Sequence, residues 1–326
     1  MPRLSIVVPI YNVSEYLSRC LESLLDQTNN DYELLLINDC STDSSLDIAK
    51  KFAEDRPDKI SLISNPNNKG LGYTRNLGLS ISKCEFITFV DSDDYVARDY
   101  VQRYLEAADR HHVDVIIGGY TRDIDGKLRR HFASNSIWSL TTYTIACAKM
   151  YRTDFLRNNN VHFSNIRCGE DIYFSSVLFC SKPSFYVMRY AGYYYYFNRK
   201  SITGTLNFEK NHEVFVSNLF NEITDTCPLS TLTPDQKWVI QYSYLANMFN
   251  ALLVHNRGCG KALMHKKYQF VFEDAKKKFP DFEQNPYISL IKPKGQTIKI
   301  RVSVWLLVKL RQIRMDHFIY EMAARS

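Results

Sequence analysis

Two hydrophobic periods alternate along the first hundred residues, and this alternation restricts the fold more than any other feature of the chain. Short apolar runs bounded by polar turns occupy residues 4–10, 33–38, 60–64 and 85–90. Runs of this kind are typical of strands that are buried on both faces of a sheet. Between them apolar residues recur at helical spacing, as at Leu17, Leu21 and Leu24. Strands that alternate with helices predict an α/β fold with a mainly parallel central sheet flanked by helices.

The rest of the chain gives weaker patterns. Strands are expected at 113–120 and 146–152, and an aromatic strand that runs into a polar loop at 193–203. A loop or hairpin is expected within 121–146, and a helix that begins at Glu170 and Asp171. Three polar residues that precede helical patterns are predicted N-caps: Ser14, Asp43 and Asp99. From about residue 212 the apolar spacing is helical. The 326 residues are therefore predicted to form an α/β domain at 1–211 and a helical C-terminal region at 212–326.

Nothing in the sequence predicts export. The N-terminal segment 1–12 has a short apolar run broken by Pro9, without the length or cleavage site of a signal peptide. The eight cysteines are scattered, with no CxxC pair and no zinc-ligand spacing, and we expect them to be reduced thiols. These features predict a cytoplasmic protein.

Basic residues gather in the C-terminal part of the chain. Residues 255–326 carry 15 Lys and Arg against 6 Asp and Glu, in a chain of net charge +6. Such a segment favours an anionic partner, for example the inner face of the cell membrane. Residues 298–322 interleave basic and apolar side chains, and their longest apolar stretch, 304–308, is too short to span a bilayer. Two interpretations stay open: peripheral membrane contact through an interfacial helix, and a helix packed on the protein.

Polar side chains follow the four predicted strands, at the edge of a parallel sheet where ligands bind. They are Tyr11 and Asn12, then Asn38, Asp39 and Ser41, then Asn65, and finally Asp91, Asp93 and Asp94. On a strand, Asp91 and Asp93 would point to the same side and raise one another's pKa. A hard divalent cation, Mg²⁺ or Mn²⁺, would remove this conflict and could carry a diphosphate. The alternative is a solvated acidic turn that caps the next helix.

Five motifs occur together in one order. They are VVPIYN (7–12), LLLINDCSTDSS (34–45), NKGLGYTRNLG (68–78), FVDSDD (89–94) and GEDIYF (169–174). This ordered set resembles the family 2 glycosyltransferases, nucleotide-sugar enzymes of the Rossmann-like GT-A fold, over roughly residues 3–205. The family often has DDGSTD where this chain has NDCSTD, so Asn38 and Cys40 are departures from its pattern.

The resemblance implies a role for each matching position. Asp39 would accept a hydrogen bond from the uracil N3–H and so select uridine. Asp93, together with Asp91, would ligate Mn²⁺ or Mg²⁺. The remaining residues implied at the nucleotide-sugar site are Pro9, Tyr11, Asn12, Asn65, Arg75, Asp91, Ser92, Arg199 and Ser201. Arg75 would pair with the pyrophosphate or the acidic cluster, unless it is a helix-surface arginine, and residues 199–201 would cover the diphosphate unless they form a solvated turn.

The Glu170–Asp171 pair resembles the family's ED motif. We expect Asp171 to be the general base that takes a proton from the acceptor hydroxyl, with Glu170 as the second choice. Displacement with one base and no covalent sugar intermediate implies inversion at the anomeric carbon. The alternative is that both acids only stabilise a helix N-terminus.

The expected function is therefore metal-assisted, inverting transfer of a hexosyl or N-acetylhexosaminyl group from a UDP-sugar. The acceptor would be a hydroxyl of a saccharide or lipid-linked saccharide in surface polysaccharide synthesis, and no nucleic acid partner is expected. One alternative is a nucleotidyltransferase, which would need a glycine- and lysine- or arginine-rich loop that VVPIYNVSEY does not contain. The other is a catalytically silent binding or scaffold protein that keeps the fold.

Overall fold

The chain forms two compact units. The computed structural model describes residues 2–166, 168–198, 211–313, 315 and 323–324. Unit 1 comprises Met1–Asn135 and Thr144–Lys200, and unit 2 comprises Ser136–Tyr143 and Ser201–Ser326. The sequence did not separate the 136–143 segment from the α/β part. The predicted boundary between two domains at residue 211 stays a prediction.

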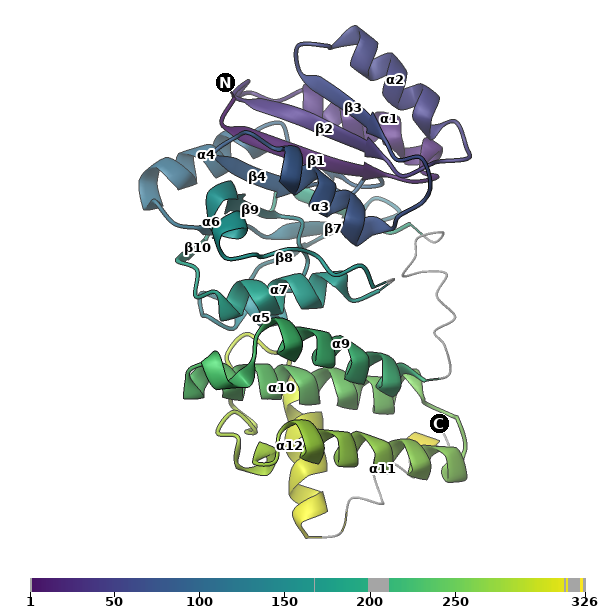
Figure 1. Cartoon of the computed structure of the whole chain (residues 1–326), viewed down its shortest axis with the longest axis vertical. Coiled ribbons are helices and arrows are strands. Elements are labelled where there is room, and N and C mark those ends of the chain that lie inside the picture. The colour runs from purple at the N-terminus through teal and green to yellow at the C-terminus, as the bar shows by residue number, and fades with distance from the viewer. Residues whose placement is uncertain (1, 167, 199–210, 314, 316–322, 325–326) are drawn as a thin grey trace. The chain divides into compact units, whose positions relative to one another are not determined.

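Unit 1 is built on a seven-stranded sheet of order β10-β6-β9-β4-β1-β2-β3 (Figure 1). The strands are β1 (Leu4–Ile10), β2 (Tyr32–Asn38), β3 (Ile60–Ser64), β4 (Phe86–Phe89), β6 (Val115–Ile117), β9 (Lys149–Arg152) and β10 (Phe185–Val187). Neighbours pair in parallel except at β9, which is antiparallel to both β4 and β6. All residues of β1 are buried, as expected for a strand that is covered on both faces. The predicted α/β fold with a mainly parallel sheet is confirmed.

Helices connect and cover these strands. They are α1 (Ser14–Leu25), α2 (Ser45–Asp55), α3 (Leu71–Ile81), α4 (Tyr100–His111), α6 (Thr153–Asn158) and α7 (Glu170–Cys180). The predicted stripe of α1 is buried, including Leu17, Leu21 and Leu24. α3 packs closely on β1, and this approach requires Gly78, because a Cβ atom there would lie 2.4 Å from a Val7 methyl carbon.

Two of the three N-cap predictions were wrong. Val13 is the N-cap of α1 and Ser44 is that of α2, while Asp99 stands at the N-cap of α4. The Asp43 carboxylate instead accepts the backbone N–H groups of Ser14 and Ser45, both at 3.0 Å. Partial burial would raise the pKa of Asp43, but the hydrogen bonds outweigh it and lower the pKa to about 2. One carboxylate thus serves the first residues of two helices.

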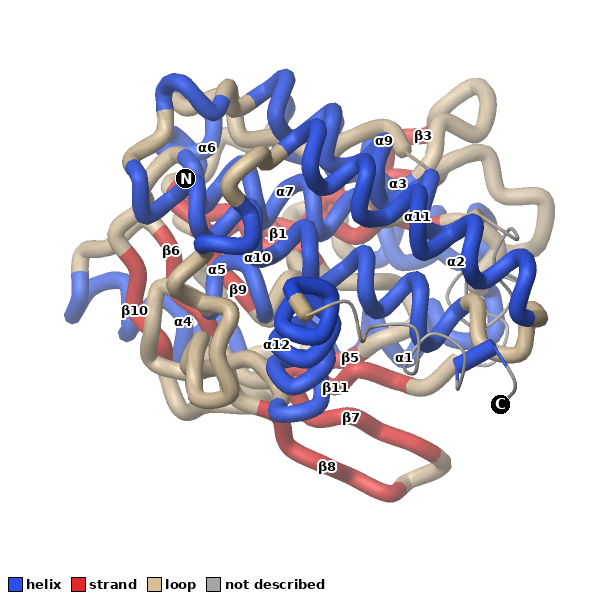
Figure 2. Tube along the Cα trace, turned by 90° about the horizontal axis from the view of Figure 1, so that it is seen from below, coloured by secondary structure: helices blue, strands red, loops and turns tan. Residues whose placement is uncertain are grey.

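Unit 1 contains a second sheet, and one of its strands directly follows the acidic cluster in the sequence. Its order is β5-β11-β7-β8, with β5 (Tyr95–Val96), β11 (Tyr193–Tyr196), β7 (Tyr120–Ile124) and β8 (Lys127–His131). Figure 2 shows β7 and β8 side by side as the hairpin predicted within 121–146. β11 is antiparallel to β5, which directly follows Asp94. This pairing brings residues 193–198 to the acidic cluster.

Unit 2 is helical in its described residues, as the spacing from residue 212 predicted. Its helices are α5 (Ser139–Thr142), α9 (His212–Thr226), α10 (Pro234–Asn250), α11 (Lys261–Lys278) and α12 (Ile298–Gln312), with short turns at Leu229–Thr231, Ala251–His255 and Phe282–Gln284. α10 packs against α5, α9, α11 and α12. It begins with a capping box between Thr233 and Gln236.

Helix α12 packs with one side against the rest of unit 2. Val304, Leu307 and Val308 of α12 are buried, and α12 contacts α10. Arg311 lies over the Phe272 ring, 4.1 Å from its centroid. In the described parts of the chain, no helix combines the length and apolar character needed to cross a membrane.

Candidate active site

The loop after β2 is fixed by short polar side chains. The Asn12 side-chain oxygen accepts the Thr42 N–H at 2.8 Å, and the Asn38 side-chain oxygen accepts the Ser41 N–H at 3.2 Å. Asn12 itself has φ +50° and Cys40 has φ +61°. Cys40 therefore adopts the left-handed conformation that the family's usual glycine would take without strain. The departure in sequence leaves the turn in place.

Asp39 is buried at the end of β2 and joins this loop to the next. Its Oδ1 accepts the Asn65 amide at 2.7 Å and the Lys69 N–H at 2.9 Å, and its Oδ2 accepts the Gly70 N–H at 2.8 Å. Gly70 has φ +89° and is the N-cap of α3. Asp39 and Asn65, predicted as separate contacts to the nucleotide, are thus held together before any ligand binds.

The acidic cluster forms a turn after β4. The Asp94 N–H donates to the Asp91 carbonyl at 3.0 Å. The Asp94 carboxylate accepts the Tyr193 hydroxyl and, at 2.8 Å, the Tyr196 N–H. Burial raises the pKa of Asp94 well above its usual value, and the nearby Asp93 and Asp91 raise it further. Asp94 therefore faces the second sheet and anchors β11.

The Asp93 carboxylate is held by a hydrogen bond from Asn198. Its Oδ2 accepts the Asn198 amide at 3.1 Å, while the Arg19 guanidinium donates to its backbone carbonyl at 2.9 Å. Burial, and then the Asp91 charge, raise the pKa of Asp93. Among the described residues no Lys or Arg forms an ion pair with the Asp93 carboxylate. The Arg19 charge acts on the Asp93 carboxylate without a direct ion pair, and it lowers the pKa of Asp93 less than burial raises it.

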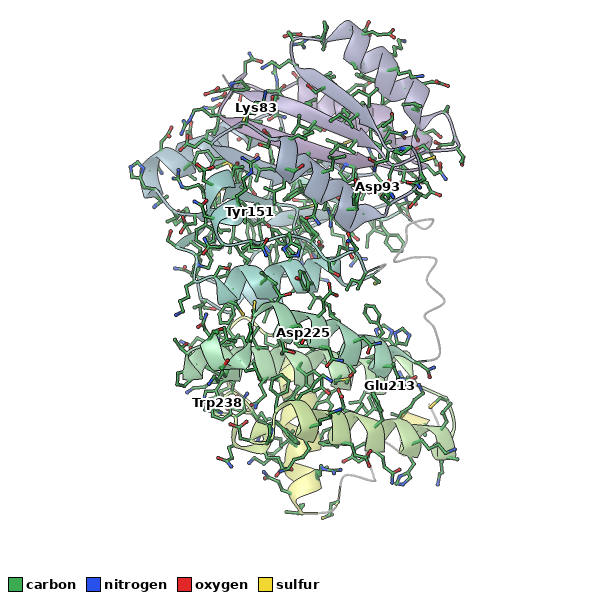
Figure 3. The ribbon with its side chains drawn as sticks, in the orientation of Figure 1. Lys83, Asp93, Tyr151, Glu213, Asp225 and Trp238 are labelled. Atoms are coloured by element: carbon green, nitrogen blue, oxygen red, sulfur yellow. The ribbon has the colours of Figure 1, made fainter. Side chains whose placement is uncertain are left out.

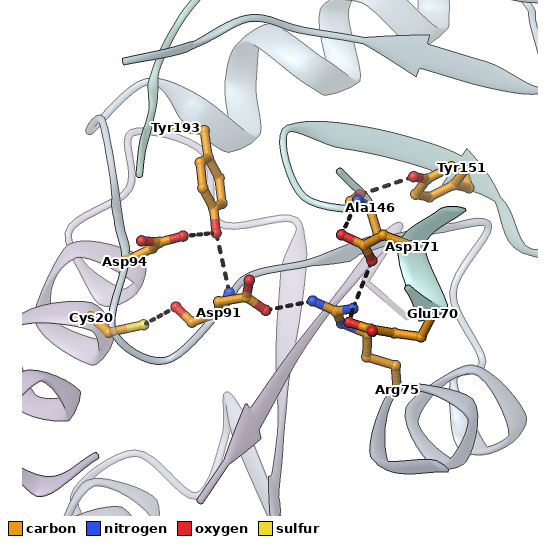
Figure 4. A network of polar contacts seen from close by, with 9 residues as sticks. All are labelled: Cys20, Arg75, Asp91, Asp94, Ala146, Tyr151, Glu170, Asp171 and Tyr193. Carbon is orange, nitrogen blue, oxygen red and sulfur yellow. Dashed lines mark hydrogen bonds and ion pairs between the residues drawn. The ribbon is translucent and has the colours of Figure 1, made fainter. Parts of the chain in front are cut away.

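Arg75 is the centre of a network of three carboxylates (Figure 4). Its guanidinium lies 2.7 Å from Asp91 Oδ1, 2.9 Å from Asp171 Oδ1 and 3.3 Å from Glu170 Oε1. Arg75 is only 1% exposed, so it is not a helix-surface arginine. The network joins the acidic turn after β4 to the first turn of α7, residues about eighty positions apart in the sequence.

The two acids of α7 are partly buried, with side chains 14% (Glu170) and 26% (Asp171) exposed, and their environments differ. Burial and then the Asp171 charge raise the pKa of Glu170 to about 7. Burial also raises the pKa of Asp171, although Arg75 opposes this shift. The Ala146 N–H lies 3.4 Å from Asp171 Oδ2 and orients the carboxylate. α7 begins at Glu170, so both acids also occupy the helix end that favours negative charge.

The donor set at the acidic turn fits a hard divalent cation. Within the described chain no group of three or more His, Cys, Asp or Glu side chains forms a metal cage. Mg²⁺ and Mn²⁺ sites that bind substrate phosphates use only one or two protein carboxylates. Asp93 and Asp91 supply that number, and the raised pKa of Asp93, caused first by burial and then by the Asp91 charge, gives a reason for a cation to bind there.

The structure brings together most of the predicted residues and adds some that the sequence did not reveal. Pro9, Asn65 and Ser92 are buried at strand ends, while Tyr11 is 45% exposed. Arg199 and Ser201 lie outside the described residues. Tyr193 and Asn198 were missed, because a run of four tyrosines (193–196) indicates packing before it indicates a role beside a carboxylate. Pairing of β11 with β5, which only the structure shows, would have identified them.

Comparisons with known proteins agree with this geometry. The family model described as Glycosyl transferase family 2 matches residues 5–168, just over half of the chain. The poly(ribitol-phosphate) beta-N-acetylglucosaminyltransferase TarS of Staphylococcus aureus is 27% identical over 323 residues, which are 96% of this chain and 52% of that protein. A poly(ribitol-phosphate) beta-glucosyltransferase of Bacillus spizizenii is 30% identical over 207 residues, 60% of this chain and 32% of the relative. The chain thus spans about half or less of the length of these relatives.

Solved structures show the same fold. The crystal structure of S. aureus TarS 1–349 in complex with UDP-GlcNAc matches with a TM-score of 0.71 and 21% identity, and the match covers 99% of this chain and 90% of that one. A mannosyltransferase from Pyrobaculum calidifontis, solved with GDP-Man and Mn²⁺, matches with a TM-score of 0.56 and 12% identity, over 95% and 88% of the two chains. The fold is therefore GT-A, as predicted, and the chain belongs to glycosyl transferase family 2.

Proposed function

We propose that this chain is a metal-assisted, inverting glycosyltransferase that uses a UDP-sugar donor in the synthesis of a surface polysaccharide. The observation that carries the proposal is the buried Arg75 with Asp91, Asp171 and Glu170 around it, at the C-terminal edge of a parallel sheet. One cation facing three acids leaves negative charge at the place where such sheets bind ligands. Metal-assisted transfer needs a base and a cation site there, and this arrangement supports the proposal of both.

The nucleotide would bind at the ends of β1 and β2. Tyr11 and Asn12 would line its pocket with Pro9, and Asp39 would accept the uracil N3–H through the remaining lone pair of Oδ2. Three existing hydrogen bonds hold Asp39 in one orientation. Binding of the donor would therefore cost little conformational entropy at this side chain. Preorganised acceptors of this kind discriminate strongly against a ring that cannot donate.

Asp93 and Asp91 would hold Mn²⁺ or Mg²⁺. The ion, when bound, would neutralise the charge that develops on the departing diphosphate. Arg75 keeps the Asp91 carboxylate fixed through its Oδ1, which leaves Oδ2 for the ion. Asn198 fixes Asp93 in the same way through Oδ2.

Asp171 would act as the general base. The acceptor hydroxyl proton moves to Asp171 while its oxygen bonds to the anomeric carbon. The bond from that carbon to the diphosphate oxygen breaks, and UDP leaves with the bonding electrons. One displacement inverts the anomeric carbon, and the base contributes about 10²–10⁴ in rate.

The first donors to test are UDP-N-acetylglucosamine and UDP-glucose, and the first acceptor is poly(ribitol phosphate), because the relatives' names specify these groups. Wild type, Asp171→Asn and Asp93→Ala are assayed for UDP release with Mn²⁺ and Mg²⁺. We expect metal-dependent release by the wild type only. Full metal-dependent turnover by Asp93→Ala would overturn the metal assignment, and UDP binding without turnover in the wild type would indicate a silent binding protein.

We also propose peripheral membrane contact through the start of the 298–322 segment, where the part described is only 298–313 and 315. Ile298 and Val302 lie one helical turn apart and are 69% and 37% exposed. Arg301 donates to the Ile291 carbonyl at 2.8 Å, which places the 74% exposed Ile291 beside them. Apolar side chains beside Lys299 suit the surface of an anionic bilayer. Vesicles containing phosphatidylglycerol should bind the wild type, and equal binding by Ile291→Asp/Ile298→Asp would contradict this contact.

A further inference from the structure

Lys149 is a buried lysine to which neither the motifs nor the proposed mechanism gives a role. It is the first residue of β9, the antiparallel strand between β4 and β6, and is 1% exposed. Removing an ammonium group from water is costly unless negative charge compensates it. A methionine would fill similar space without that cost. The lysine therefore needs a physical reason to be there.

The backbone that leads to Lys149 is strained and firmly held. Ala148 has φ +56°, a left-handed conformation that is rare for a residue with a Cβ atom. Its carbonyl accepts the Tyr104 hydroxyl at 2.6 Å and the Gly118 N–H at 2.9 Å. The Lys149 carbonyl accepts the Thr88 hydroxyl at 2.7 Å. Strain that is kept in place by several bonds is typical of functional sites.

The same segment contacts the predicted base. The Ala146 N–H lies 3.4 Å from Asp171 Oδ2, and the Tyr151 hydroxyl donates to the Ala146 carbonyl at 2.9 Å. Lys149 and Asp171 attract one another electrostatically. Burial lowers the pKa of Lys149 to about 8, with Asp171 opposing the shift, so the ammonium form dominates at neutral pH. A second positive charge thus acts on Asp171 in addition to Arg75.

We propose that Lys149 is a positioning residue for the transfer reaction, and that its buried ammonium keeps Asp171 ionised and ready to accept the hydroxyl proton. The proposal rests on the proposed function, in which Asp171 is the base. With Lys149 the buried network holds two positive charges against three carboxylates. Other titratable and charged groups in this region, from each neighbouring element, are Arg75, Asp91, Tyr100, Tyr104, Cys147, Tyr151, Glu170 and Tyr193.

Lys149→Met and Lys149→Arg distinguish this role from packing. The acid limb of the pH profile for UDP release from UDP-N-acetylglucosamine reports protonation of the base. Loss of the ammonium raises the pKa of Asp171, so the limb should move to higher pH by about one unit, with a loss of up to about tenfold at pH values below the limb. Lys149→Arg should keep the wild-type limb. Lys267→Met, which removes a buried lysine of unit 2, is the matched control and should leave the limb in place.

A second measurement does not depend on turnover. Protein labelled with ¹³C at the aspartate carboxyl carbons is titrated by NMR, and the Asp171 signal is assigned by its absence from Asp171→Asn. Its midpoint should rise in Lys149→Met, or in Lys149→Gln if the methionine variant does not fold. A wild type that releases no UDP from any donor would refute the proposed function, while the carboxyl titration would still decide the electrostatic role. An unchanged midpoint in the lysine variants would overturn the proposal.

Discussion

Buried charge is balanced in unit 2 and unbalanced in unit 1. In unit 2 the Lys267 ammonium lies 2.6 Å from Glu213, and the Asn256 amide donates to the other Glu213 oxygen at 3.1 Å. In unit 1 the guanidinium of Arg75 faces three carboxylates, and among the described residues the Asp93 carboxylate has an amide partner and no ion pair. Figure 3 marks Glu213 and Asp93 in their respective units.

The same residue types therefore serve two purposes: in unit 2 they stabilise the fold, and in unit 1 they provide groups for chemistry. A one-to-one pair with its hydrogen bonds completed neutralises itself and needs no further partner. An excess of carboxylates is stable only with a cation, a proton or a substrate group. The backbone follows the same division, since every described non-glycine residue with positive φ lies in unit 1, including Asn12, Cys40 and Ala148. Charge excess thus locates the site independently of any motif, while the left-handed residues mark the unit that contains it.

The largest effect is expected from Arg75→Met. It removes the buried cation from three partly buried carboxylates, and the loss should approach the cost of a broken buried ion pair, about 3–5 kcal/mol. UDP release should fall to background, because Asp91 and Asp171 lose their fixed positions together. Chemical denaturation and UDP release measured on the folded fraction test both parts. Activity within a few-fold of the wild type would show that the network is only structural.

The balanced pair should respond differently. Lys267→Met alone leaves Glu213 buried without a cation and should cost about 3–5 kcal/mol, while the double variant Lys267→Met/Glu213→Gln should recover most of this loss. UDP release per folded molecule should stay at the wild-type level in both. The matched double variant in unit 1, Arg75→Met/Asp91→Asn, should recover little, because two carboxylates remain. The free energy of unfolding is measured with urea. Equal recovery of stability by the two double variants would contradict the difference between the two units.

Glu170→Gln should reduce the excess of carboxylates around Arg75 in unit 1 and stabilise the protein. A carboxyl whose pKa is raised to about 7 in the folded state stabilises the fold below pH 4.5, and this contribution is lost as pH rises to about 7. The glutamine variant should therefore be more stable than the wild type by about 1–3 kcal/mol at pH 7.5, with little difference at pH 4.5. Unfolding free energies measured at the two pH values test this sign. A constant difference across the range would show that Glu170 is not the group that titrates.

The sequence predicted the parallel sheet and the acids at its edge because both follow from local patterns. Apolar runs indicate buried strands, and parallel strands place their C-terminal ends together, so Asp39 and Asp91 could be expected at one edge. Lys149 and Tyr193 could not, since their roles depend on which strands pair over long distances in the sequence. The antiparallel insertion of β9 and the pairing of β11 with β5 are tertiary choices that leave no periodic signal. The pairing of Arg75 with the acidic cluster was predicted, but its contacts with Glu170 and Asp171 were missed for the same reason.

The smallest expected effect concerns the strained turn after β2. Cys40→Gly removes a left-handed strain of about 1–2 kcal/mol but adds glycine's unfolded-state entropy, roughly 0.5–1 kcal/mol, for a net gain of about 0.5 kcal/mol. His112→Gly, at the φ +49° residue that ends α4 away from the site, is the matched control with the same expected gain. KM for the UDP-sugar should not change in either variant, because the turn geometry is already the one that glycine would adopt. A change in KM for Cys40→Gly alone would show that the cysteine side chain, and not only the shape of the turn, contributes to binding of the UDP-sugar.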